Sequence, residues 1–218
     1  VPSHFWIMNL LPVESIDLAT STLKTAVPGT YPLGRNGMTD RPSAWIENAI
    51  EVLDEPGEWF LAREGKLYYR PRPGEDPTSM EFVAPVTRQF VQIQGDPAGG
   101  RFVEHVHFQG LAFQHGQWLT PAEGYGPAQA ASRLEATVML DGARNVVFQD
   151  CEIAHVGIHG LWFRRGCSQC RVERCLISDL GAGGVRIGEI RIRDNPAEQT
   201  HHITLDNNII RSGGRIFT

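Results

Sequence analysis

The stretch Arg144-Asn-Val-Val-Phe-Gln-Asp-Cys-Glu-Ile-Ala-His155 decides the fold, because three other segments align with it without gaps. These segments are residues 104–115, 168–179 and 201–212. The aligned columns that are almost wholly apolar read Val106, Val146, Cys170 and Ile203; Phe108, Phe148, Val172 and Leu205; Leu111, Cys151, Cys175 and Asn208; and Phe113, Ile153, Ile177 and Ile210. Such a repeat indicates that equivalent segments stack on one another.

Each repeat contains a break in its alternation of apolar and polar residues. The period of two runs through Val146 and Phe148 and restarts at Cys151, so one extra residue lies between the two runs. That residue is Gly110, Asp150, Arg174 or Asn207 in the four repeats. Gly, Asn and Asp tolerate a left-handed backbone, and Arg is the less suited member of the column. The pattern therefore predicts two short strands joined by a one-residue bend.

A third short strand is predicted between the repeats, at residues 138–140, 161–163 and 185–187. Together the strands predict an all-β fold, a right-handed parallel β-helix of about four coils with three short strands per coil, over residues 87–218. The spacing between equivalent residues varies from 24 to 40, which places inserted loops at about 118–135 and 189–200. We expect the β-helix to be truncated at its C-terminal end.

Residues 1–86 lack the repeat, and we expect them to form a small N-terminal β-rich or mixed unit. Residues 44–53 have apolar residues at helical spacing and predict one short helix. The apolar runs 59–61 and 67–69, separated by Glu64-Gly65-Lys66, predict a hairpin.

Composition excludes few classes of protein. A hydrophobic content of 41% and a charged content of 21% are ordinary for a globular domain, and no apolar run is long enough to span a bilayer. The net charge of −5 argues against a nucleic-acid partner. The first residues have neither the basic region nor the apolar region of a signal peptide.

The cysteines raise the question of a metal or redox site. Cys167 and Cys170 form a C-x-x-C, which can be a redox pair or half of a zinc site. No second pair completes a zinc site, so we expect buried neutral thiols, with no metal and no cofactor.

One family resemblance rests on the strings Trp45-Ile-Glu-Asn48, Leu53-Asp-Glu-Pro-Gly-Glu-Trp-Phe60 and Leu67-Tyr-Tyr69. With the coil repeats, they resemble bacterial β-helix proteins of polysaccharide breakdown, similar to glycoside hydrolase family 141 and its uncharacterised relatives, over roughly residues 40–214. The resemblance implies a secreted or periplasmic bacterial protein that acts on plant or host glycans. No catalytic carboxylate of the family matches a position here, so none is carried over.

A polar column follows the last apolar column by two residues: His115, His155, Asp179 and Ser212. Because strands of adjacent coils lie about 4.8 Å apart, His155 and Asp179 can pair, and we take them as catalytic candidates. The alternative is a structural ladder in which these side chains bond to turn amides.

The outward face of the predicted third strand carries Met139, Trp162 and Arg186. Trp162 offers a flat ring to a sugar, and Arg186 offers a fork to a carboxylate or hydroxyls. The other candidate substrate-binding residues are His159, His115, Trp118 and Tyr125, the last two in the insertion at 118–135.

Glycoside hydrolysis normally needs two carboxyl groups. Asp179, Glu135, Asp141 and Glu152 are candidates, and no pair stands out. The sequence therefore favours a carbohydrate-processing domain of a glycoside hydrolase. A non-catalytic carbohydrate-binding or surface module is the alternative, and a Ca²⁺-dependent polysaccharide lyase is a third option that lacks an acidic cluster on these strands.

Overall fold

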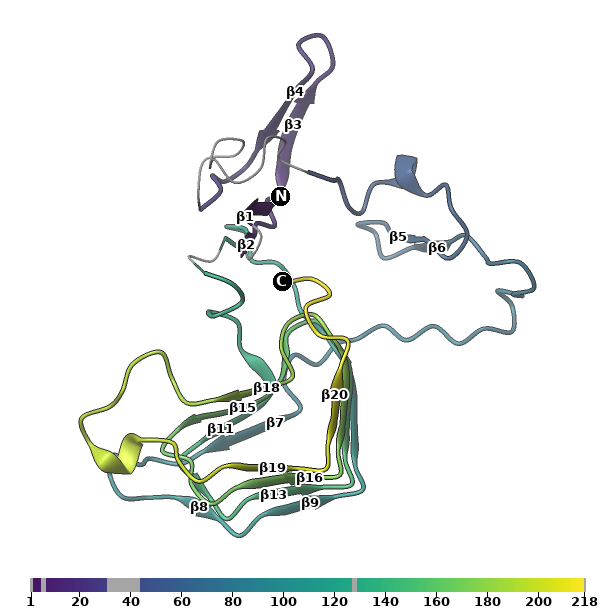
Figure 1. Ribbon diagram of the computed structural model, residues 1–218. Coiled ribbons are helices and arrows are strands. Elements are labelled where there is room, and N and C mark those ends of the chain that lie inside the picture. The colour runs from purple at the N-terminus through teal and green to yellow at the C-terminus, as the bar shows by residue number, and fades with distance from the viewer. Residues whose placement is uncertain (1, 5–6, 31–43, 127–128, 218) are drawn as a thin grey trace.

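The computed structural model describes residues 2–4, 7–30, 44–126 and 129–217. Within these ranges the chain is all-β, and its helical turns are two short 3-10 segments, η1 (Ile50–Val52) and η2 (Pro196–Glu198). Three parallel four-stranded sheets form the main body, and the chain passes from one sheet to the next before it returns to the first (Figure 1). The arrangement is β-helix-like.

Each sheet takes its strands from successive passes of the chain. The first sheet contains β7 (Val91–Gln94), β11 (Ala136–Asp141), β15 (His159–Arg165) and β18 (Val185–Ile187). The second contains β9 (His107–Gln109), β13 (Val147–Gln149), β16 (Arg171–Glu173) and β19 (Thr204–Asp206). The third contains β10 (Ala112–Gly116), β14 (Glu152–Val156), β17 (Leu176–Leu180) and β20 (Ile209–Arg211). Beside them, β8 (Val103–Glu104) pairs with β12 (Ala143–Arg144).

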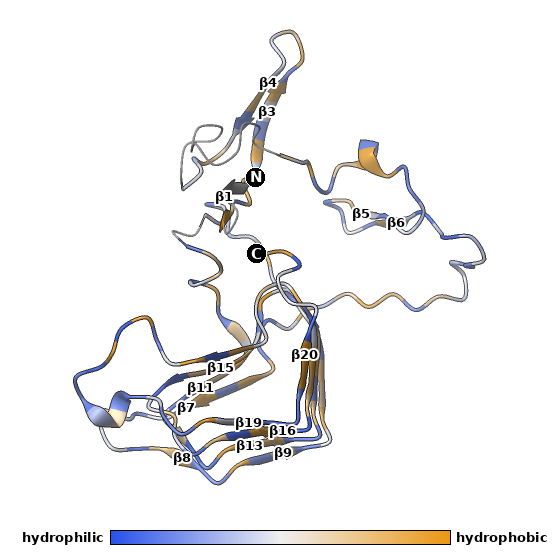
Figure 2. Cartoon of the chain, viewed as in Figure 1, coloured by the Kyte–Doolittle hydropathy of each residue, from blue (hydrophilic) through white to orange (hydrophobic). Residues whose placement is uncertain are grey.

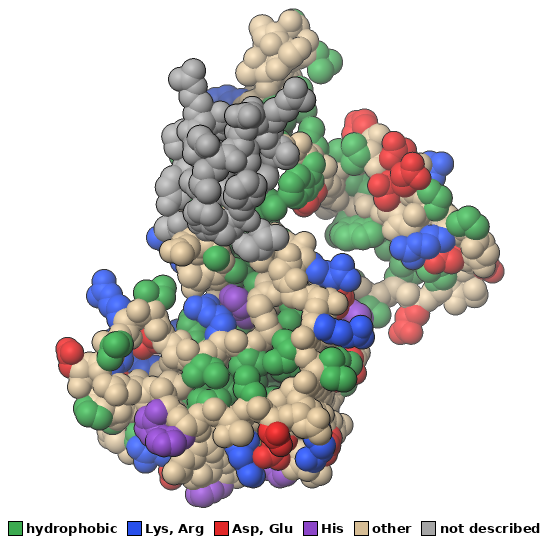
Figure 3. All heavy atoms as spheres, in the orientation of Figure 1, with side chains coloured by type: hydrophobic (Ala, Val, Ile, Leu, Met, Phe, Trp, Pro, Cys, Tyr) green, Lys and Arg blue, Asp and Glu red, His purple; other side chains and the backbone are tan. Residues whose placement is uncertain are grey.

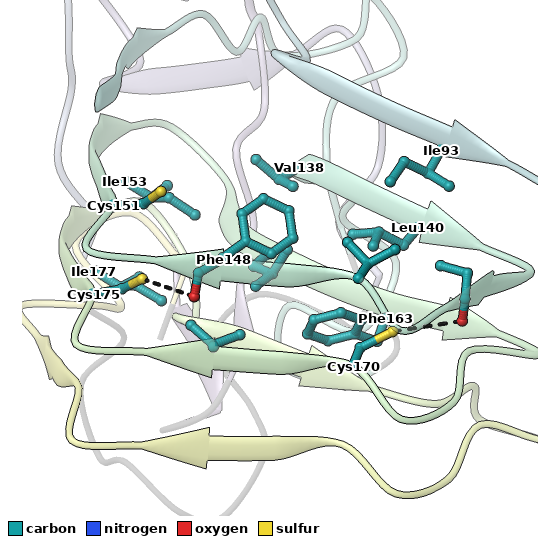
Figure 4. Packing of buried hydrophobic residues seen from close by; sticks show 14 of the residues in the cluster. Ile93, Val138, Leu140, Phe148, Cys151, Ile153, Phe163, Cys170, Cys175 and Ile177 are labelled. Atoms are coloured by element: carbon teal, nitrogen blue, oxygen red, sulfur yellow. Dashed lines mark hydrogen bonds between the residues drawn. The ribbon is translucent and has the colours of Figure 1, made fainter. Parts of the chain in front are cut away.

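The strand register matches the columns predicted from the sequence. Phe148 pairs with Phe108 on one side and Val172 on the other, and Val172 pairs with Leu205. In the third sheet the column of Phe113, Ile153, Ile177 and Ile210 is equally in register. Phe148 is 1% exposed and stacks on Phe108 with ring centroids 4.7 Å apart. The apolar columns therefore form the interior between the sheets (Figure 4).

The corners of the chain path use left-handed residues in three stacked columns. The predicted bends at Gly110, Asp150, Arg174 and Asn207 all have φ between 53° and 66°. Two further columns have positive φ as well: His105, Asn145, Gln169 and His202, and His115, His155, Asp179 and Ser212. Arg174 tolerates this conformation beside Asp150, to which its Nε donates at 2.7 Å. The sequence pattern indicated only the first column.

The four cysteines lie at corners of the chain path. Cys151, Cys167, Cys170 and Cys175 are buried, and each directly follows a residue with positive φ. Each thiol donates to a backbone carbonyl of the preceding pass, as Cys175 does to Phe148 and Cys170 does to Ala143 (Figure 4). Burial raises the pKa of the Cys167 thiol to about 12. The thiols therefore fill the corners as small apolar groups.

The N-terminal part consists of separate antiparallel pairs. β1 (Pro2–His4) pairs with β2 (Ile7–Met8), and β3 (Val13–Asp17) pairs with β4 (Thr22–Thr25). The predicted hairpin is confirmed as β5 (Trp59–Leu61) with β6 (Leu67–Tyr69).

The predicted helix at 44–53 is wrong apart from the single turn η1. Asn48 has a φ of 53°, which no right-handed helix can contain, and Ala49 begins η1 without a side-chain cap. The carboxamide of Asn48 instead accepts a bond from Leu61 N at 3.3 Å and so holds β5.

The Pro-Gly-Glu string that carried the family resemblance builds a turn. Oε2 of Glu58 accepts from the backbone N–H groups of Asp54 and Glu55, at 2.9 and 2.8 Å. Gly57 has a φ of 95°, and its N–H donates to Arg70 O at 2.7 Å, beside the end of β6. These contacts give Glu58 and Gly57 a structural role in the turn, and they do not indicate a catalytic or binding role.

The N-terminal part joins the main body through the insertion at 118–135. Leu10 and Tyr125 exchange both backbone hydrogen bonds, at 2.8 and 2.9 Å. The predicted boundary at about residue 86 lies shortly before β7 and remains a prediction. Across the described ranges, no helix has the length and apolar character needed to cross a membrane.

Hydrophobic and hydrophilic residues are interspersed along the strands of the three sheets (Figure 2). At the end of the stack formed by β18, β19 and β20, some hydrophobic side chains are uncovered (Figure 3). Ile187, Leu205 and Ile210 are between 41% and 50% exposed.

Candidate functional site

The first sheet places the predicted outward row in register. Met139 pairs with Trp162, and Trp162 pairs with Arg186, while Gln92 precedes Met139 in the same row. Met139 is 7% exposed, and the side chain of Gln89 contacts its sulfur at 2.9 Å. The accessible part of the row is therefore Gln92, Trp162 and Arg186.

Trp162 is covered on one face by Arg186. The guanidinium of Arg186 lies 3.7 Å from the centre of the Trp162 ring. The indole N–H donates to Gly188 O at 2.8 Å, which ties β15 to the start of the loop after β18. A sugar would therefore meet a joined Trp162–Arg186 pair rather than an open indole face.

Arg186 also binds the insertion at 118–135. Its Nη1 donates to Leu134 O at 2.7 Å, and its Nη2 donates to Ser132 O at 3.1 Å. The side chain is half-buried, and burial lowers its pKa from the ordinary value. Arg186 thus fixes the insertion beside the face of the first sheet, as well as presenting a cation there.

Trp118 and Tyr125, two of the candidate substrate-binding residues, pack into a second hydrophobic cluster, and a role for them in binding remains a prediction. Trp118 meets Tyr125 edge to face, with ring centroids 5.9 Å apart, and Phe217 contacts both rings. Ile158 and Leu134 belong to the same cluster. These two aromatic side chains therefore anchor the insertion to the corner between the third and first sheets.

His159 is buried at 7% exposure and both of its ring nitrogens have partners. Nδ1 accepts from Gly183 N at 2.9 Å, so Nε2 carries the proton that it donates to Ala131 O at 3.1 Å. Burial lowers the pKa of His159, which favours the neutral ring. Substrate binding by His159 remains a prediction, and its contacts favour a structural role.

The third sheet brings the two catalytic candidates together. His155 on β14 and Asp179 on β17 are hydrogen-bonded, with Nδ1 and Oδ2 2.7 Å apart. His115 stacks on His155 with ring centroids 5.0 Å apart and an angle of 11° between the planes. Arg215, which the sequence analysis missed, pairs with the other oxygen of Asp179. The result is a partly exposed row in which two stacked histidine rings are followed by Asp179 and Arg215.

The backbone of this row supplies a structural reason for its composition. His115, His155 and Asp179 have φ between 54° and 60°. His, Asn and Asp are enriched in this region among residues other than Gly. The column therefore satisfies a backbone requirement whether or not it has a chemical function. It also lies on the third sheet, whereas Trp162 and Arg186 lie on the first.

The other candidate carboxylates are mostly paired. Asp141 is held by Arg164, whose Nε donates to Oδ1 at 2.9 Å. Glu135 is exposed and lies 3.9 Å from Arg88, and Glu152 on β14 is half-buried. Glu189, which the sequence analysis did not single out, binds Arg193 and Arg165, and these arginines lower its pKa to about 2.

No group of three or more metal-ligating side chains occurs in the described part of the chain. The C-x-x-C does not supply one, because both of its thiols are buried and hydrogen-bonded to backbone carbonyls.

Comparison with known proteins gives one informative match. No family model matches the chain, and no curated protein does. A solved structure named "Glycoside hydrolase" matches with a TM-score of 0.80 over 97% of this chain, at 22% sequence identity. This likeness shows a shared fold. The match covers 44% of that protein, so the chain spans less than half of its length.

Proposed function

We propose that this chain is a carbohydrate-processing domain of a glycoside hydrolase, built as a right-handed parallel β-helix of about four coils. The observation that carries the proposal is the match, over nearly the whole chain, to a structure named as a glycoside hydrolase. The resemblance to family 141 and the expected secreted or periplasmic location belong to the same proposal.

The glycan would lie along the first sheet, between the two insertions, and would extend over the turn between β17 and β18 to Asp179 near the end of β17. The insertion at 118–135 is held there by Arg186, and the loop after β18 is held by Trp162 and by the pair of Arg165 and Glu189. A partly covered aromatic ring with a guanidinium on its face offers both apolar contact and hydrogen-bond donors to a sugar.

Asp179 is the carboxylate that we propose for chemistry, because a histidine and an arginine hold its two oxygens in place. His155 would move a proton to or from this site, since an imidazole can act as acid or base near neutral pH. A second carboxyl group, about 5 Å away for retention or roughly 6.5 to 9.5 Å for inversion, is still to be assigned.

A non-catalytic carbohydrate-binding module is the second candidate. The observation that favours it is that Asp141 and Asp179 are both neutralised by arginines of this chain. A nearby guanidinium favours the ionised carboxylate, so such a group is less available to donate a proton than a carboxyl group that burial keeps protonated.

The test is a screen of plant and mucin glycans for binding and hydrolysis, using this chain, a longer form that spans the whole protein, and two tryptophan variants of each. Trp162→Ala should abolish glycan binding. Trp59→Ala is the matched control, because Trp59 is 63% exposed on β5, in the separate N-terminal hairpin.

Hydrolysis by the longer form, lost in Asp179→Asn, supports the enzyme. Binding that depends on Trp162 without hydrolysis by either form supports the binding module. If no glycan binds, or if Trp59→Ala and Trp162→Ala weaken binding equally, the first sheet is not a glycan site.

A further inference from the structure

Three glutamines occupy the end of the first sheet that lies opposite β18. Gln92 and Gln94 belong to the edge strand β7, and Gln89 lies just before that strand. Gln92 pairs with Met139, which in turn pairs with Trp162, so these side chains leave the sheet on the same side. Gln94 follows Gln92 by two residues and therefore shares that side. Gln92 and Gln94 are exposed, so the outward face continues across β7 as a polar, uncharged surface.

The three carboxamides form a directed chain of hydrogen bonds. Nε2 of Gln94 donates to Oε1 of Gln92 at 3.3 Å, and Nε2 of Gln92 donates to Oε1 of Gln89. Nε2 of Gln89 donates to Ala136 O at 3.1 Å, and it also contacts the sulfur of Met139. Since groups in such a chain orient and polarise one another, the two exposed carboxamides have a preferred direction before any ligand arrives.

Both exposed carboxamides keep hydrogen-bonding capacity for a partner from outside the chain. A carboxamide has two N–H donors and an oxygen with two lone pairs. Within the described ranges, Gln94 uses one donor, and Gln92 uses one donor and one lone pair. A hydroxyl is both a donor and an acceptor, so neighbouring sugar hydroxyls can bond to the oxygen and to the N–H of one carboxamide.

The charges around the glutamines are balanced by contacts within the chain. Asp141, the strand partner of Gln94, is held by Arg164, whose Nε donates to Oδ1 at 2.9 Å. Arg88, which precedes β7, lies 3.9 Å from Glu135. A ligand carboxylate would meet no unpaired cation here among the residues that the structure describes, and partly desolvating it against neutral amides is unfavourable. The β7 end of the face therefore favours an uncharged sugar.

We propose that Gln92 and Gln94 form a subsite of the glycan face that binds the hydroxyls of an uncharged sugar. This inference rests on the proposed function, because it extends the same face. Two strand spacings separate Gln92 from Trp162, roughly 10 Å. A monosaccharide on Trp162 ends short of the glutamines, whereas an oligosaccharide that crosses the strands reaches them.

The test is an NMR titration of this chain with tetrasaccharides of galactose, glucose, mannose and xylose, with a tetramer of galacturonic acid, and with the methyl glycoside of each neutral sugar. At least one neutral tetramer should bind more tightly than the galacturonic acid tetramer. Gln92→Met and Gln94→Met keep the size of the side chain and remove its hydrogen bonds, so each should weaken that neutral tetramer about five-fold. Neither change should alter the affinity for the methyl glycoside of the same sugar.

Gln109→Met is the matched control, because Gln109 is an exposed glutamine on β9, the corresponding edge strand of the second sheet. It should leave every affinity unchanged. A second measurement covers the case in which Gln92→Met lowers the melting temperature. In the parent protein, the side-chain amide resonances of Gln92 and Gln94 should shift when the neutral tetramer is added and stay in place with the methyl glycoside.

The outcomes distinguish this inference from the proposed function. Equal effects of Gln92→Met and Gln109→Met, with binding still lost in Trp162→Ala, overturn the glutamine subsite and leave the glycan face intact. Tighter binding of the galacturonic acid tetramer than of every neutral tetramer overturns the preference for an uncharged sugar. Absence of binding by all the tetramers and in the wider glycan screen overturns both this inference and the proposed function.

Discussion

Replacing Tyr125 by Phe should make the protein more stable. The change removes one oxygen whose accessible surface is almost zero and which has no partner in the described residues. A buried polar group without a partner costs roughly 1–3 kcal/mol. The ring contacts with Trp118 and Phe217 do not involve the hydroxyl, so the packing of the cluster should remain. We expect the free energy of unfolding to rise by about 1 kcal/mol.

The assay is urea denaturation together with thermal unfolding. For a chain of this size, a change of about 1 kcal/mol moves the melting temperature by roughly 2–4 °C. The denaturant slope should not change, because the buried area is nearly the same. Tyr69→Phe is the matched control: its hydroxyl bonds to Glu75, so this variant should be less stable than the parent.

A loss of stability in Tyr125→Phe of more than about 0.5 kcal/mol would refute the reasoning, because it would show that the hydroxyl has a partner in solution.

The remaining predictions concern the polar row, pH and the thiols. His155→Gly should be more stable than His155→Ala by about 1 kcal/mol in chemical denaturation, because φ is 54° there; equal stabilities would argue against a left-handed backbone at this position. If the row is catalytic, Asp179→Ala should abolish activity with little change in melting temperature, whereas a large loss of stability would assign it to a structural ladder. Glu189 has a pKa lowered to about 2, so its stabilising effect is full above about pH 5 and is lost as the pH falls toward 2; Glu189→Gln should flatten the denaturation profile in that window. Burial lowers the pKa of His159, so stability should fall as the pH drops below about 6.5, and a profile unchanged in His159→Gln would show that another group is responsible. The four buried cysteines should react with a thiol reagent only at the rate of unfolding, and fast labelling of the native protein would contradict their burial.

The parallel strands could be predicted from the sequence because a repeat multiplies weak signals. A single pair such as Val146 and Phe148 is ordinary, but four aligned copies fix both the strand positions and their register. The same alignment predicted that His155 and Asp179 would meet, and they do.

The N-terminal part was less predictable because it has no such copies. Residues 44–53 have helical spacing, yet the left-handed Asn48 ends any helix there, and single-sequence periodicity does not report one residue's φ. The hairpin of β3 and β4 was missed as well, since its strands are exposed and carry no clear alternation of burial.

The contacts of Arg186 could not be predicted, because its partners lie in an insertion that the repeat does not contain. The sequence placed the guanidinium beside Trp162 but gave no sign that the carbonyls of Ser132 and Leu134 would bind it. Nor could spacing reveal Arg215 beside Asp179, since Arg215 lies outside the repeat and reaches back from the segment after β20.

The left-handed corners have a consequence for how this scaffold can change. Equivalent residues lie 24, 33 or 40 positions apart, yet the strands stay in register on both sides of each insertion. The extra residues leave the stack between two corners and return to it, so their length is uncoupled from the pairing of the sheets. The loops at 118–135 and 189–200 could thus be shortened, lengthened or exchanged to alter what the first sheet recognises, while the columns beneath them keep the same partners.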